Sequence, residues 1–393
     1  MVDIDASAFG HWFSDPVFVE MRRLVATHGG GSLNEDLLEL CGGLGTAYLA
    51  DRCLGKSPRL VGYYDTDVNL LPWLRKLHGS ALVGVHCGVS GDIMATRCSR
   101  FPPAHKIVVG APCIPWSFKG SRESWQDKRS EVFRKCLQII VHQARQGSLR
   151  EFVLENVMGM VPEHDGASPI AEVIDYLQEK LGGEWKVQCL FVNSIDFCLA
   201  QNRPRIYVIG VKGGTGQLHM AKFATKAQFA DCLDGYTESP VHHYTKGSLP
   251  QNLYEYKVWL QAAMNDRALT GQFAVFAVDR TPASRTTWSV TKHIASCECL
   301  TTKGPLLHVL SLGEGCDITS KSVRLTADRP LSPPERGRLH GFPEWFIDIN
   351  TLYEPAALVA FGNAMSVPVL AAGSYAAFAR RLNLPPLRRV CKT

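Results

Sequence analysis

Residues 108–117 read VVGAPCIPWS, and this stretch decides how the rest of the chain is interpreted. The apolar, β-branched run at 107–109 predicts a buried strand, which Gly110-Ala111-Pro112 ends abruptly. Cys113 therefore follows the carboxyl end of a strand, where open α/β sheets bind their ligands. A free thiol at that place is a candidate nucleophile, and the alternative is a buried structural cysteine.

The composition is that of an ordinary globular protein. Of 393 residues, 46% are hydrophobic and 20% are charged, and the net charge of +5 permits a nucleic-acid partner without requiring one. Thirteen cysteines without a regular spacing indicate reduced thiols in an intracellular compartment. Since no apolar run reaches membrane-spanning length and the N-terminus lacks a basic leader, we expect neither membrane insertion nor secretion.

A strand, a glycine turn and a helix follow one another near the N-terminus. Residues 36–40 predict a short strand, residues 41–46 read CGGLGT, and a helix is expected over 47–53. This order begins a nucleotide-binding βαβ unit, in which small residues let a ligand approach the backbone. Tight turns also require glycine, so the motif alone leaves ligand binding open.

Acidic residues follow the next two predicted strands. The strand at 60–64 ends at Asp65-Thr66-Asp67, and Asp65 lies twenty residues after Gly45, the distance at which a carboxylate binds ribose hydroxyls. A helix N-cap is the alternative role for Asp65. A third strand, at 81–86, leads to Asp92. Glycines and acids at successive strand ends indicate a small-molecule cofactor, while the absence of GxxxxGK[ST] argues against a P-loop nucleotide triphosphatase.

Three more side chains are candidates for chemistry. A buried strand at 151–157 carries Glu155, and burial that keeps its carboxyl group protonated would make it a proton donor; a solvated acid is the alternative. Arg203 and Arg205 stand two residues apart on an extended segment and therefore point the same way. They form a fork for a phosphate or carboxylate, unless they are exposed hairpin residues.

The composition and the hydrophobic pattern of the sequence divide the chain into four parts. Residues 1–35 predict a helical extension, and 36–214 hold the strands and turns just described. Residues 215–333 are richer in polar and turn-forming residues, which indicates a smaller inserted domain. Helices rich in small residues return over 334–393 and are expected to complete the main domain.

Eight short motifs, in order, resemble those of the cytosine-C5 DNA methyltransferases. They are ELCGGLG at 39–45, DTD at 65–67, GDI at 91–93, PC at 112–113, ENV at 155–157, QNRPR at 201–205, RLHGFP at 338–343 and GNA at 362–364. The resemblance covers roughly residues 36 to 372. It implies an α/β, Rossmann-like, S-adenosylmethionine-dependent methyltransferase fold, in which 36–214 and 334–393 form the catalytic domain and 215–333 form a target-recognition domain.

The resemblance also implies a reaction and the residues that perform it. Cys113 would add to C6 of a cytosine flipped out of the duplex, and C5 would then accept a methyl group from S-adenosylmethionine, leaving S-adenosyl-L-homocysteine. Glu155 would act on N3 and Arg203 on O2, while Arg205 would position Glu155 or a phosphate. The implied cofactor-binding residues are Cys41, Gly42, Gly43, Leu44, Gly45, Tyr64, Asp65, Thr66, Asp92, Ile93, Pro112, Asn363 and Ala364.

Two other functions remain open. A related branch that methylates tRNA carries a Cys-Phe-Thr triplet, which Cys299-Leu300-Thr301 matches in part, but Ser117 stands where that branch tends to have threonine, which favours DNA. A non-catalytic nucleic-acid-binding module is disfavoured by the presence of all four candidate catalytic residues.

The remaining expectations concern metals, assembly and location. Zinc at His293, Cys297 and Cys299 would lack a fourth ligand and the usual CxxC spacing, so no metal is expected. We expect a monomer, located in the nucleus of a eukaryote or the cytoplasm of a bacterium.

Overall fold

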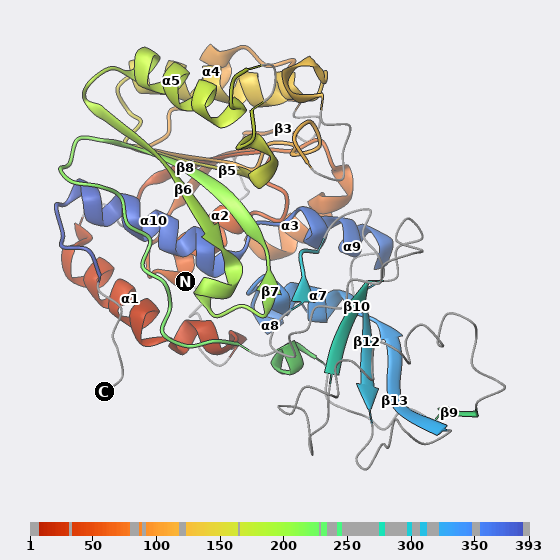
Figure 1. Ribbon diagram of the computed structural model, residues 1–393. Coiled ribbons are helices and arrows are strands. Elements are labelled where there is room, and N and C mark those ends of the chain that lie inside the picture. The colour runs from red at the N-terminus through yellow and green to blue at the C-terminus, as the bar shows by residue number, and fades with distance from the viewer. Residues whose placement is uncertain are drawn as a thin grey trace.

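The computed structural model describes residues 8–30, 34–78, 86–88, 92–117, 123–163, 166–227, 229–233, 242–245, 275–279, 297–300, 307–312, 322–347 and 354–387. Its centre is a seven-stranded sheet with helices on both faces (Figure 1). The strands, in spatial order, are β3 (His86–Gly88), β2 (Arg59–Tyr64), β1 (Asp36–Leu40), β4 (Lys106–Val109), β5 (Glu151–Val157), β8 (Pro204–Lys212) and β6 (Trp185–Asn193).

Strands β3, β2, β1, β4 and β5 pair in parallel, whereas β8 runs antiparallel to both β5 and β6. The parallel strands are joined by helices, and β4 is buried along its whole length, as expected for a strand covered on both faces. The predicted Rossmann-like α/β fold is therefore confirmed. Because the parallel strands share one direction, the turns after β1, β2, β4 and β5 meet at one edge of the sheet.

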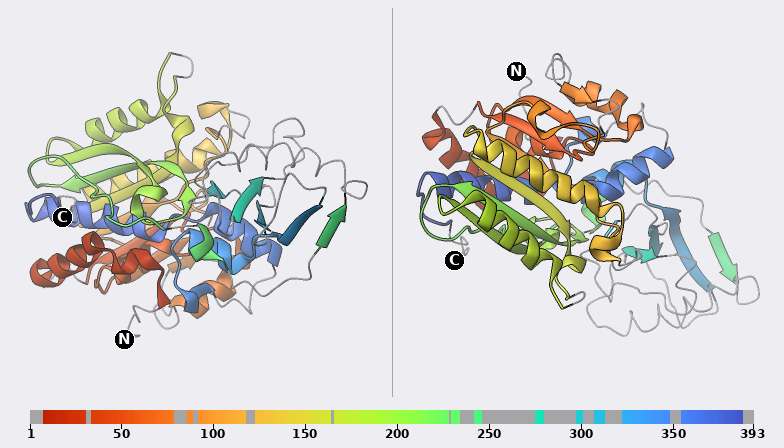
Figure 2. Two further views of the ribbon diagram at one scale, coloured as in Figure 1. Left: turned by 60° about the horizontal axis from the view of Figure 1, so that its bottom comes forward. Right: turned by 90° about the horizontal axis from the view of Figure 1, so that it is seen from above.

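Helices cover both faces of the sheet (Figure 2). The first face carries α4 (Ser130–Arg145) and α5 (Pro169–Leu181), and in α4 the buried Phe133, Leu137 and Ile140 recur at helical spacing. The second face carries α1 (Pro16–His28), α2 (Thr46–Cys53), α3 (Leu71–His78) and α10 (Val367–Arg381).

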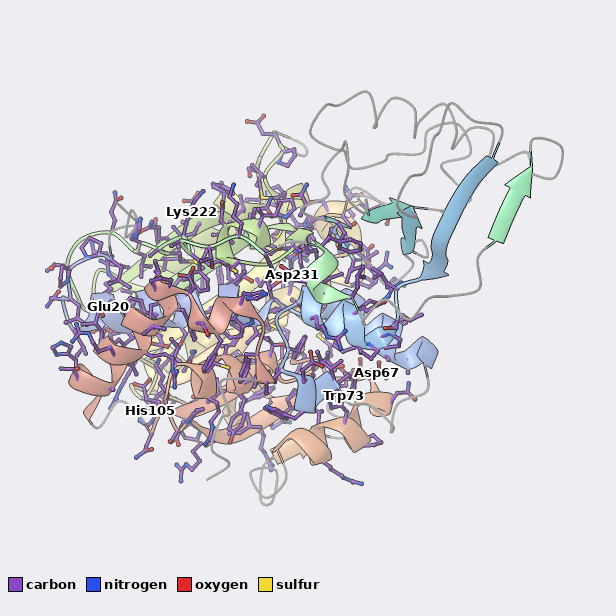
Figure 3. All side chains as sticks on the ribbon, turned by 90° about the horizontal axis from the view of Figure 1, so that it is seen from below. Glu20, Asp67, Trp73, His105, Lys222 and Asp231 are labelled. Carbon is purple, nitrogen blue, oxygen red and sulfur yellow. The ribbon has the colours of Figure 1, made fainter. Side chains whose placement is uncertain are left out.

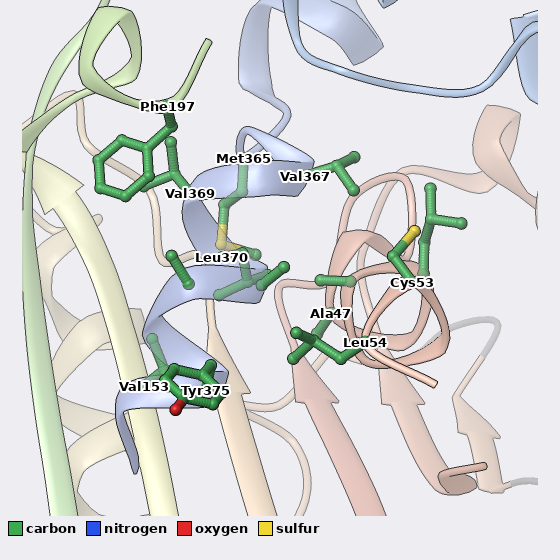
Figure 4. Close-up of a cluster of buried hydrophobic side chains, with 14 of the residues drawn as sticks. Ala47, Cys53, Leu54, Val153, Phe197, Met365, Val367, Val369, Leu370 and Tyr375 are labelled. Atoms are coloured by element: carbon green, nitrogen blue, oxygen red, sulfur yellow. The ribbon is translucent and has the colours of Figure 1, made fainter. Parts of the chain in front are cut away.

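Helix α10 is the centre of the larger hydrophobic core. Its Leu370 and Tyr375 lie among Ala47 and Leu54 of the α2 region and Val153 of β5 (Figure 4). The stretch Ala356–Arg381, which spans most of α9 (Glu354–Asn363) and all of α10, is long and apolar enough to cross a membrane by composition. However, 78% of its most apolar window is buried inside the protein, which is the behaviour of a core helix.

The N-terminal region packs on the same core. A short 3-10 helix, η2 (His11–Ser14), precedes α1, and Trp12 and Phe18 meet with ring centroids 4.9 Å apart. Asp15 caps α1 by accepting a hydrogen bond from the Val17 amide at 2.9 Å, as the Ser-Asp-Pro sequence predicts. The second Asp15 carboxylate oxygen accepts two hydrogen bonds of 2.7 Å from Thr225, which ties this region to the segment after β8.

The segment after β8 divides into two parts. Leu218, Met220 and Phe223 are buried in the larger core, so the predicted boundary at residue 215 precedes a stretch that packs on the main domain. A second, four-stranded sheet follows, formed by β9 (His242–Thr245), β10 (Val275–Asp279), β12 (Leu307–Leu312) and β13 (Ser322–Pro330). It projects from the edge of the main domain near α7 (Pro333–Leu339) and α8 (Glu344–Ile347) (Figure 1).

Candidate active site

Cys113 lies in a tight turn immediately after β4. Its carbonyl oxygen accepts hydrogen bonds from the Trp116 amide at 3.1 Å and the Ser117 amide at 2.9 Å. The residue is partly buried, and its side chain lines a cavity at the carboxyl edge of the sheet. The structure therefore places the thiol where the sequence predicts a nucleophile.

The turn is fixed from behind by Trp116. This side chain is fully buried, and its ring meets the rings of Trp125 and Phe133 edge-on, each with centroids 5.3 Å apart. Gly159, after β5, lies against the Trp116 backbone so closely that a Cβ atom would come within 1.8 Å of the Trp116 carbonyl oxygen. Only glycine permits this approach, and the turn that presents Cys113 is thereby held in place.

The cavity has a volume of about 440 Å³ and brings most of the predicted residues together. All four predicted catalytic side chains line it: Cys113, Glu155, Arg203 and Arg205. Nine of the predicted cofactor residues line it as well: Cys41, Gly43, Tyr64, Asp65, Thr66, Asp92, Ile93, Pro112 and Asn363. One continuous cavity thus joins the thiol to the glycine turn.

Glu155 and the two arginines form a buried charge cluster beside Cys113. The Arg205 Nε atom lies 3.1 Å from Glu155 Oε1, and Arg203 Nη2 lies 4.0 Å from the same oxygen. Arg203 is held by backbone carbonyl groups, since its Nη2 donates to Ala364 at 2.8 Å and its Nη1 to Leu300 at 3.2 Å. These fixed guanidinium groups are suited to stabilise negative charge that develops in the cavity.

The environment of Cys113 disfavours its ionisation in the resting protein. Burial raises the pKa of the Cys113 thiol; Arg205 opposes this change, and the Glu155 charge adds to it. The thiolate should therefore form more easily when Glu155 is neutral. A protonated Glu155 would both supply a proton donor and remove one negative charge next to the nucleophile.

The glycine turn after β1 is shaped by Tyr63. A Cβ atom on Gly42 would lie 2.4 Å from the Tyr63 ring, and the Tyr63 hydroxyl donates a hydrogen bond of 2.5 Å to the Gly43 carbonyl. Gly45 adopts a φ of 68° at the N-cap of α2, a conformation that favours glycine. The sequence pattern gives no sign of this tyrosine contact, because Tyr63 belongs to the next strand.

Asp65 closes the turn from the end of β2. Its Oδ2 accepts a hydrogen bond from the Gly43 amide and its Oδ1 from the Asp67 amide, each at 2.9 Å. Burial raises the pKa of this carboxyl group, and the two backbone donors oppose the change. Asp65 therefore braces the glycine turn while it also lines the cavity.

Four predicted cofactor residues do not line the cavity. Three of them shape the glycine turn: Gly42 gives room to the Tyr63 ring, Leu44 is buried in the core, and Gly45 is the N-cap of α2. The fourth, Ala364, accepts a hydrogen bond from Arg203 through its carbonyl oxygen. Conversely, the sequence reasoning missed Gly110, where a Cβ atom would come 3.0 Å from the Cys41 carbonyl oxygen, and the apolar Val132 and Val359 on the cavity wall. Gly110 could have been predicted as a site residue, because it is a glycine at the end of a strand. Nothing in the sequence pattern distinguishes the two valines from core residues.

The structure describes only some of the residues that were considered as zinc ligands. Among the residues that the structure describes, no three His, Cys, Asp or Glu side chains come together as a metal site requires. Cys297 and Cys299 are described, whereas His293 and Gly91 of the GDI motif lie outside the described residues.

Comparison with known proteins identifies the family. The model of the C-5 cytosine-specific DNA methylases matches residues 86–376. The Type II methyltransferase M.NgoBI of Neisseria gonorrhoeae is 26% identical over 72% of this chain and 76% of its own length. M.HpaII of Haemophilus parainfluenzae is 25% identical, with coverages of 72% and 74%. M.BanI of Aneurinibacillus aneurinilyticus is 34% identical, but that match spans only 33% of this chain and 28% of the relative.

Solved structures agree on the fold. The Dnmt2 methyltransferase of S. pombe has a TM-score of 0.57 at 16% identity, covering 89% of this chain and all of the other. The methyltransferase EhMeth of Entamoeba histolytica has a TM-score of 0.56 at 14% identity, covering 88% and 98%. With the family model spanning most of the chain and the motif residues gathered in one cavity, the chain belongs to the C-5 cytosine-specific DNA methylases.

Proposed function

We propose that this protein transfers a methyl group from S-adenosylmethionine to C5 of cytosine in DNA, through a covalent bond between Cys113 and C6 of the base. The observation that carries the proposal is the single cavity shared by Cys113, Glu155 and both arginines at one end and the Gly43–Asp65 turn at the other. The matches to the methylase family and to Type II methyltransferases support the same reaction.

The Cys113 thiolate adds to C6 of the cytosine ring. The ring alone is too weak a nucleophile at C5, and addition of the thiolate pushes electron density onto C5, N3 and O2. Glu155 donates its proton to N3, and the Arg203 guanidinium group stabilises the charge at O2. After C5 is methylated, loss of the C5 proton to a base or water expels Cys113 and restores the aromatic ring.

The other end of the cavity has groups that fit the methyl donor. S-adenosylmethionine supplies a methyl group on a positively charged sulfur, and its ribose and adenine need a hydrogen-bond acceptor and an aromatic or apolar wall. Asp65 and Asp92 offer carboxylates, and Tyr64 offers a ring at the same wall. Pro112 and Asn363 line the space between that wall and Cys113.

The depth of the site bears on how DNA enters. Glu155 is only 7% exposed and Arg203 only 4%, so a base that remains stacked in a duplex cannot reach them. We therefore propose that the target cytosine is flipped out of the helix. The second sheet projects from the main domain near α7 and α9 (Figure 1), and α9 contributes Val359 and Asn363 to the cavity lining. We therefore propose that residues 215–333 recognise the target sequence.

The remaining assignments follow from the proposed reaction. We propose a monomer that works inside the cell on DNA, in the cytoplasm of a bacterium or the nucleus of a eukaryote. Methylation of tRNA by the same residues is the second candidate, because Cys299 of the partial Cys-Leu-Thr match lies against the catalytic arginines.

The test uses DNA and tRNA that contain 5-fluorocytosine, together with S-adenosylmethionine. Fluorine cannot leave C5 as a proton does, so the covalent complex should accumulate, and peptide mass spectrometry should locate the adduct on Cys113. Unsubstituted DNA and tRNA, read by bisulfite sequencing, show which nucleic acid is methylated. An adduct on another cysteine would contradict the mechanism, and methylation of tRNA alone would reverse the choice of substrate.

A further inference from the structure

The second domain reaches the catalytic residues through a short strand pair. Strand β11 (Cys297–Glu298) pairs in parallel with β7 (Gln201–Asn202), and the Cys297 amide donates a hydrogen bond of 2.8 Å to the Ala200 carbonyl. Because β7 runs directly into Arg203, the residue that follows β11 is brought beside the two arginines. That residue is Cys299.

Cys299 contacts both catalytic arginines. Its Sγ atom accepts hydrogen bonds of 3.4 Å from Arg203 Nη1 and from Arg205 Nη2. The adjacent Leu300 carbonyl accepts from Arg203 Nη1 at 3.2 Å, and the Leu300 side chain is buried with Leu339 in a small apolar cluster. The sulfur is therefore anchored by its own backbone rather than by the arginines alone.

The charge around Cys299 favours the thiolate. Burial alone would raise the pKa of the Cys299 thiol, but the guanidinium groups of Arg203 and Arg205 reverse this and hold the pKa below its ordinary value. Cys113 lies in the same cluster and shows the opposite direction, because burial raises its pKa. The two arginines therefore favour the thiolate form of both cysteines, but their effect exceeds that of burial only at Cys299.

Arg205 is shared between two partners. Its Nε atom faces Glu155 Oε1 at 3.1 Å, while its Nη2 donates to Cys299. Arg203 Nη2 is 4.0 Å from the same glutamate oxygen, while it donates to the Ala364 carbonyl at 2.8 Å. The orientation of both guanidinium groups toward Glu155 therefore depends on the partners of their other nitrogen atoms, and Cys299 contacts one such atom of each arginine.

We propose that Cys299 is a positioning residue, whose sulfur fixes the guanidinium groups of Arg203 and Arg205 in the orientation in which they face Glu155 and the cavity, so that the inserted domain completes the catalytic site. This inference rests on the proposed cytosine methylation. It predicts that loss of the sulfur disturbs the two arginines while the fold is retained.

The first test compares Cys299→Ala and Cys299→Ser by their kcat and their KM for DNA. We expect Cys299→Ala to lower kcat about 10–100-fold, as removal of a group that orients a functional residue commonly does. KM should change less, because the arginines are proposed to stabilise charge that develops during the reaction. Serine, which retains an acceptor atom, should restore part of the rate. An unchanged kcat in Cys299→Ala would overturn the proposal.

Cys297→Ala is the matched control, because Cys297 lies two residues earlier and its side chain is fully buried in the apolar cluster. It should lower Tm without lowering the kcat of the folded protein. A loss of kcat equal to that of Cys299→Ala would show that any loosening of this strand suffices and would overturn the positioning role. The melting temperature of Cys299→Ser confirms that the serine variant is folded.

The second test does not depend on activity. The difference in thiolate absorbance near 240 nm between Cys113→Ala and Cys113→Ala/Cys299→Ala, followed against pH, titrates Cys299 alone. We expect its midpoint below the ordinary thiol value of about 8.5. A midpoint at or above that value would refute the arginine contacts. If the wild-type protein methylates no cytosine while the titration gives a low midpoint, the proposed function fails and the contact stands.

Discussion

The two ends of strands β4 and β5 both hold buried charges, and they use them in opposite ways. Lys106 begins β4 and Glu151 begins β5, whereas Cys113 follows β4 and Glu155 lies near the end of β5. His105, just before β4, and Asp67, just after β2, lie at opposite ends of the sheet in Figure 3.

At the amino end the charges face one another. Lys106 Nζ donates to Asp51 at 2.8 and 2.9 Å and to Ser374 Oγ at 2.6 Å, and it lies 3.5 Å from Glu151. Burial by itself would raise the pKa of Asp51, but Lys106 and Lys56 lower it to about 2. This network joins β4, β5, α2 and α10 and is fully enclosed.

At the carboxyl end the charges face open space. Glu155 pairs with Arg205, yet both line the cavity together with Cys113. The difference between the two ends teaches that burial and ion pairing do not by themselves identify an active site. What distinguishes the catalytic end is the adjoining cavity, into which a substrate can bring the missing partner.

The largest expected effect is from Cys113→Ala, which should abolish methyl transfer. The variant removes the only atom proposed to bond to C6, whereas the turn is held by Trp116 and by backbone hydrogen bonds that alanine retains. The free energy of unfolding and the affinity for S-adenosylmethionine should therefore change little. Turnover measured with tritiated methyl donor checks the first expectation, and retained turnover would rule out Cys113 as the nucleophile.

Glu155→Gln and Glu151→Gln form a matched pair on one strand. Glu155→Gln should lower kcat about 10²–10⁴-fold, the usual contribution of a general acid, with a small effect on Tm. Glu151→Gln should lower Tm, because Lys106 and Arg381 lose a charged partner, while the folded fraction keeps its kcat. If both variants lose activity in proportion to lost stability, the contrast between the two ends is wrong.

Lys106→Met should lower the free energy of unfolding by about 3–5 kcal/mol, because it leaves the buried carboxylates of Asp51 and Glu151 without their common cation. Methionine fills a similar volume, so loss of charge rather than a void is tested. Urea unfolding measures the change. A loss below 1 kcal/mol would show that Lys56 and Arg381 already satisfy the two acids.

The pH dependence of the free energy of unfolding tests whether Asp51 is the main partner of Lys106. The pKa of Asp51 is lowered from an unfolded value of about 3.9 to about 2 in the folded protein. Its stabilising contribution is therefore present above about pH 4 and is lost as pH falls toward 2. The free energy of unfolding of the wild type should therefore fall more between pH 4 and pH 2 than that of Lys106→Met, in which Asp51 lacks this cation, so the difference between the two proteins should shrink below pH 4. A difference that stays constant through this window would exclude Asp51 as the main partner.

Much of the catalytic end could be predicted from the sequence, because its signals are local. Apolar runs followed by turn residues gave the strands that precede Cys113 and Asp65, and β5 spans the predicted residues. The start of β6 at Trp185 is harder to predict, since polar residues alternate with apolar ones along this edge strand.

The amino end could not be predicted, because its contacts join residues far apart in the chain. Asp51 and Ser374 are 323 residues apart, and neither belongs to a motif. The sequence drew attention to Cys299, but its contact with the arginines could not be predicted for the same reason, because they stand nearly a hundred residues earlier. Local patterns give the elements and their ends, whereas such pairings depend on which elements become neighbours in the folded sheet.

Asp65 combines features of both ends and gives the smallest predicted effect. Its carboxylate accepts two backbone hydrogen bonds, as in a closed structural contact, and it also lines the cavity. Asp65→Asn keeps one acceptor oxygen for the glycine turn but removes the charge proposed to bind the ribose hydroxyls. We expect S-adenosylmethionine to bind about 1–3 kcal/mol more weakly by calorimetry, the scale for leaving a polar partner unsatisfied.

Asp67→Asn is the control, since the Asp67 carboxylate also lies at the cavity but accepts hydrogen bonds from Asn69. It should change the binding free energy by less than about 0.5 kcal/mol, the usual scale for a substitution that removes no ligand contact, because the Asp67 carboxylate is already bound by Asn69. If Asp65→Asn lowers Tm while the affinity stays unchanged, Asp65 only braces the turn and belongs with the closed contacts of the amino end. If the affinity for S-adenosylmethionine falls and Tm is unchanged, the Asp65 carboxylate contacts the ligand. The same turn then contains both a structural contact, from Asp65 to the Gly43 amide, and a ligand-binding charge.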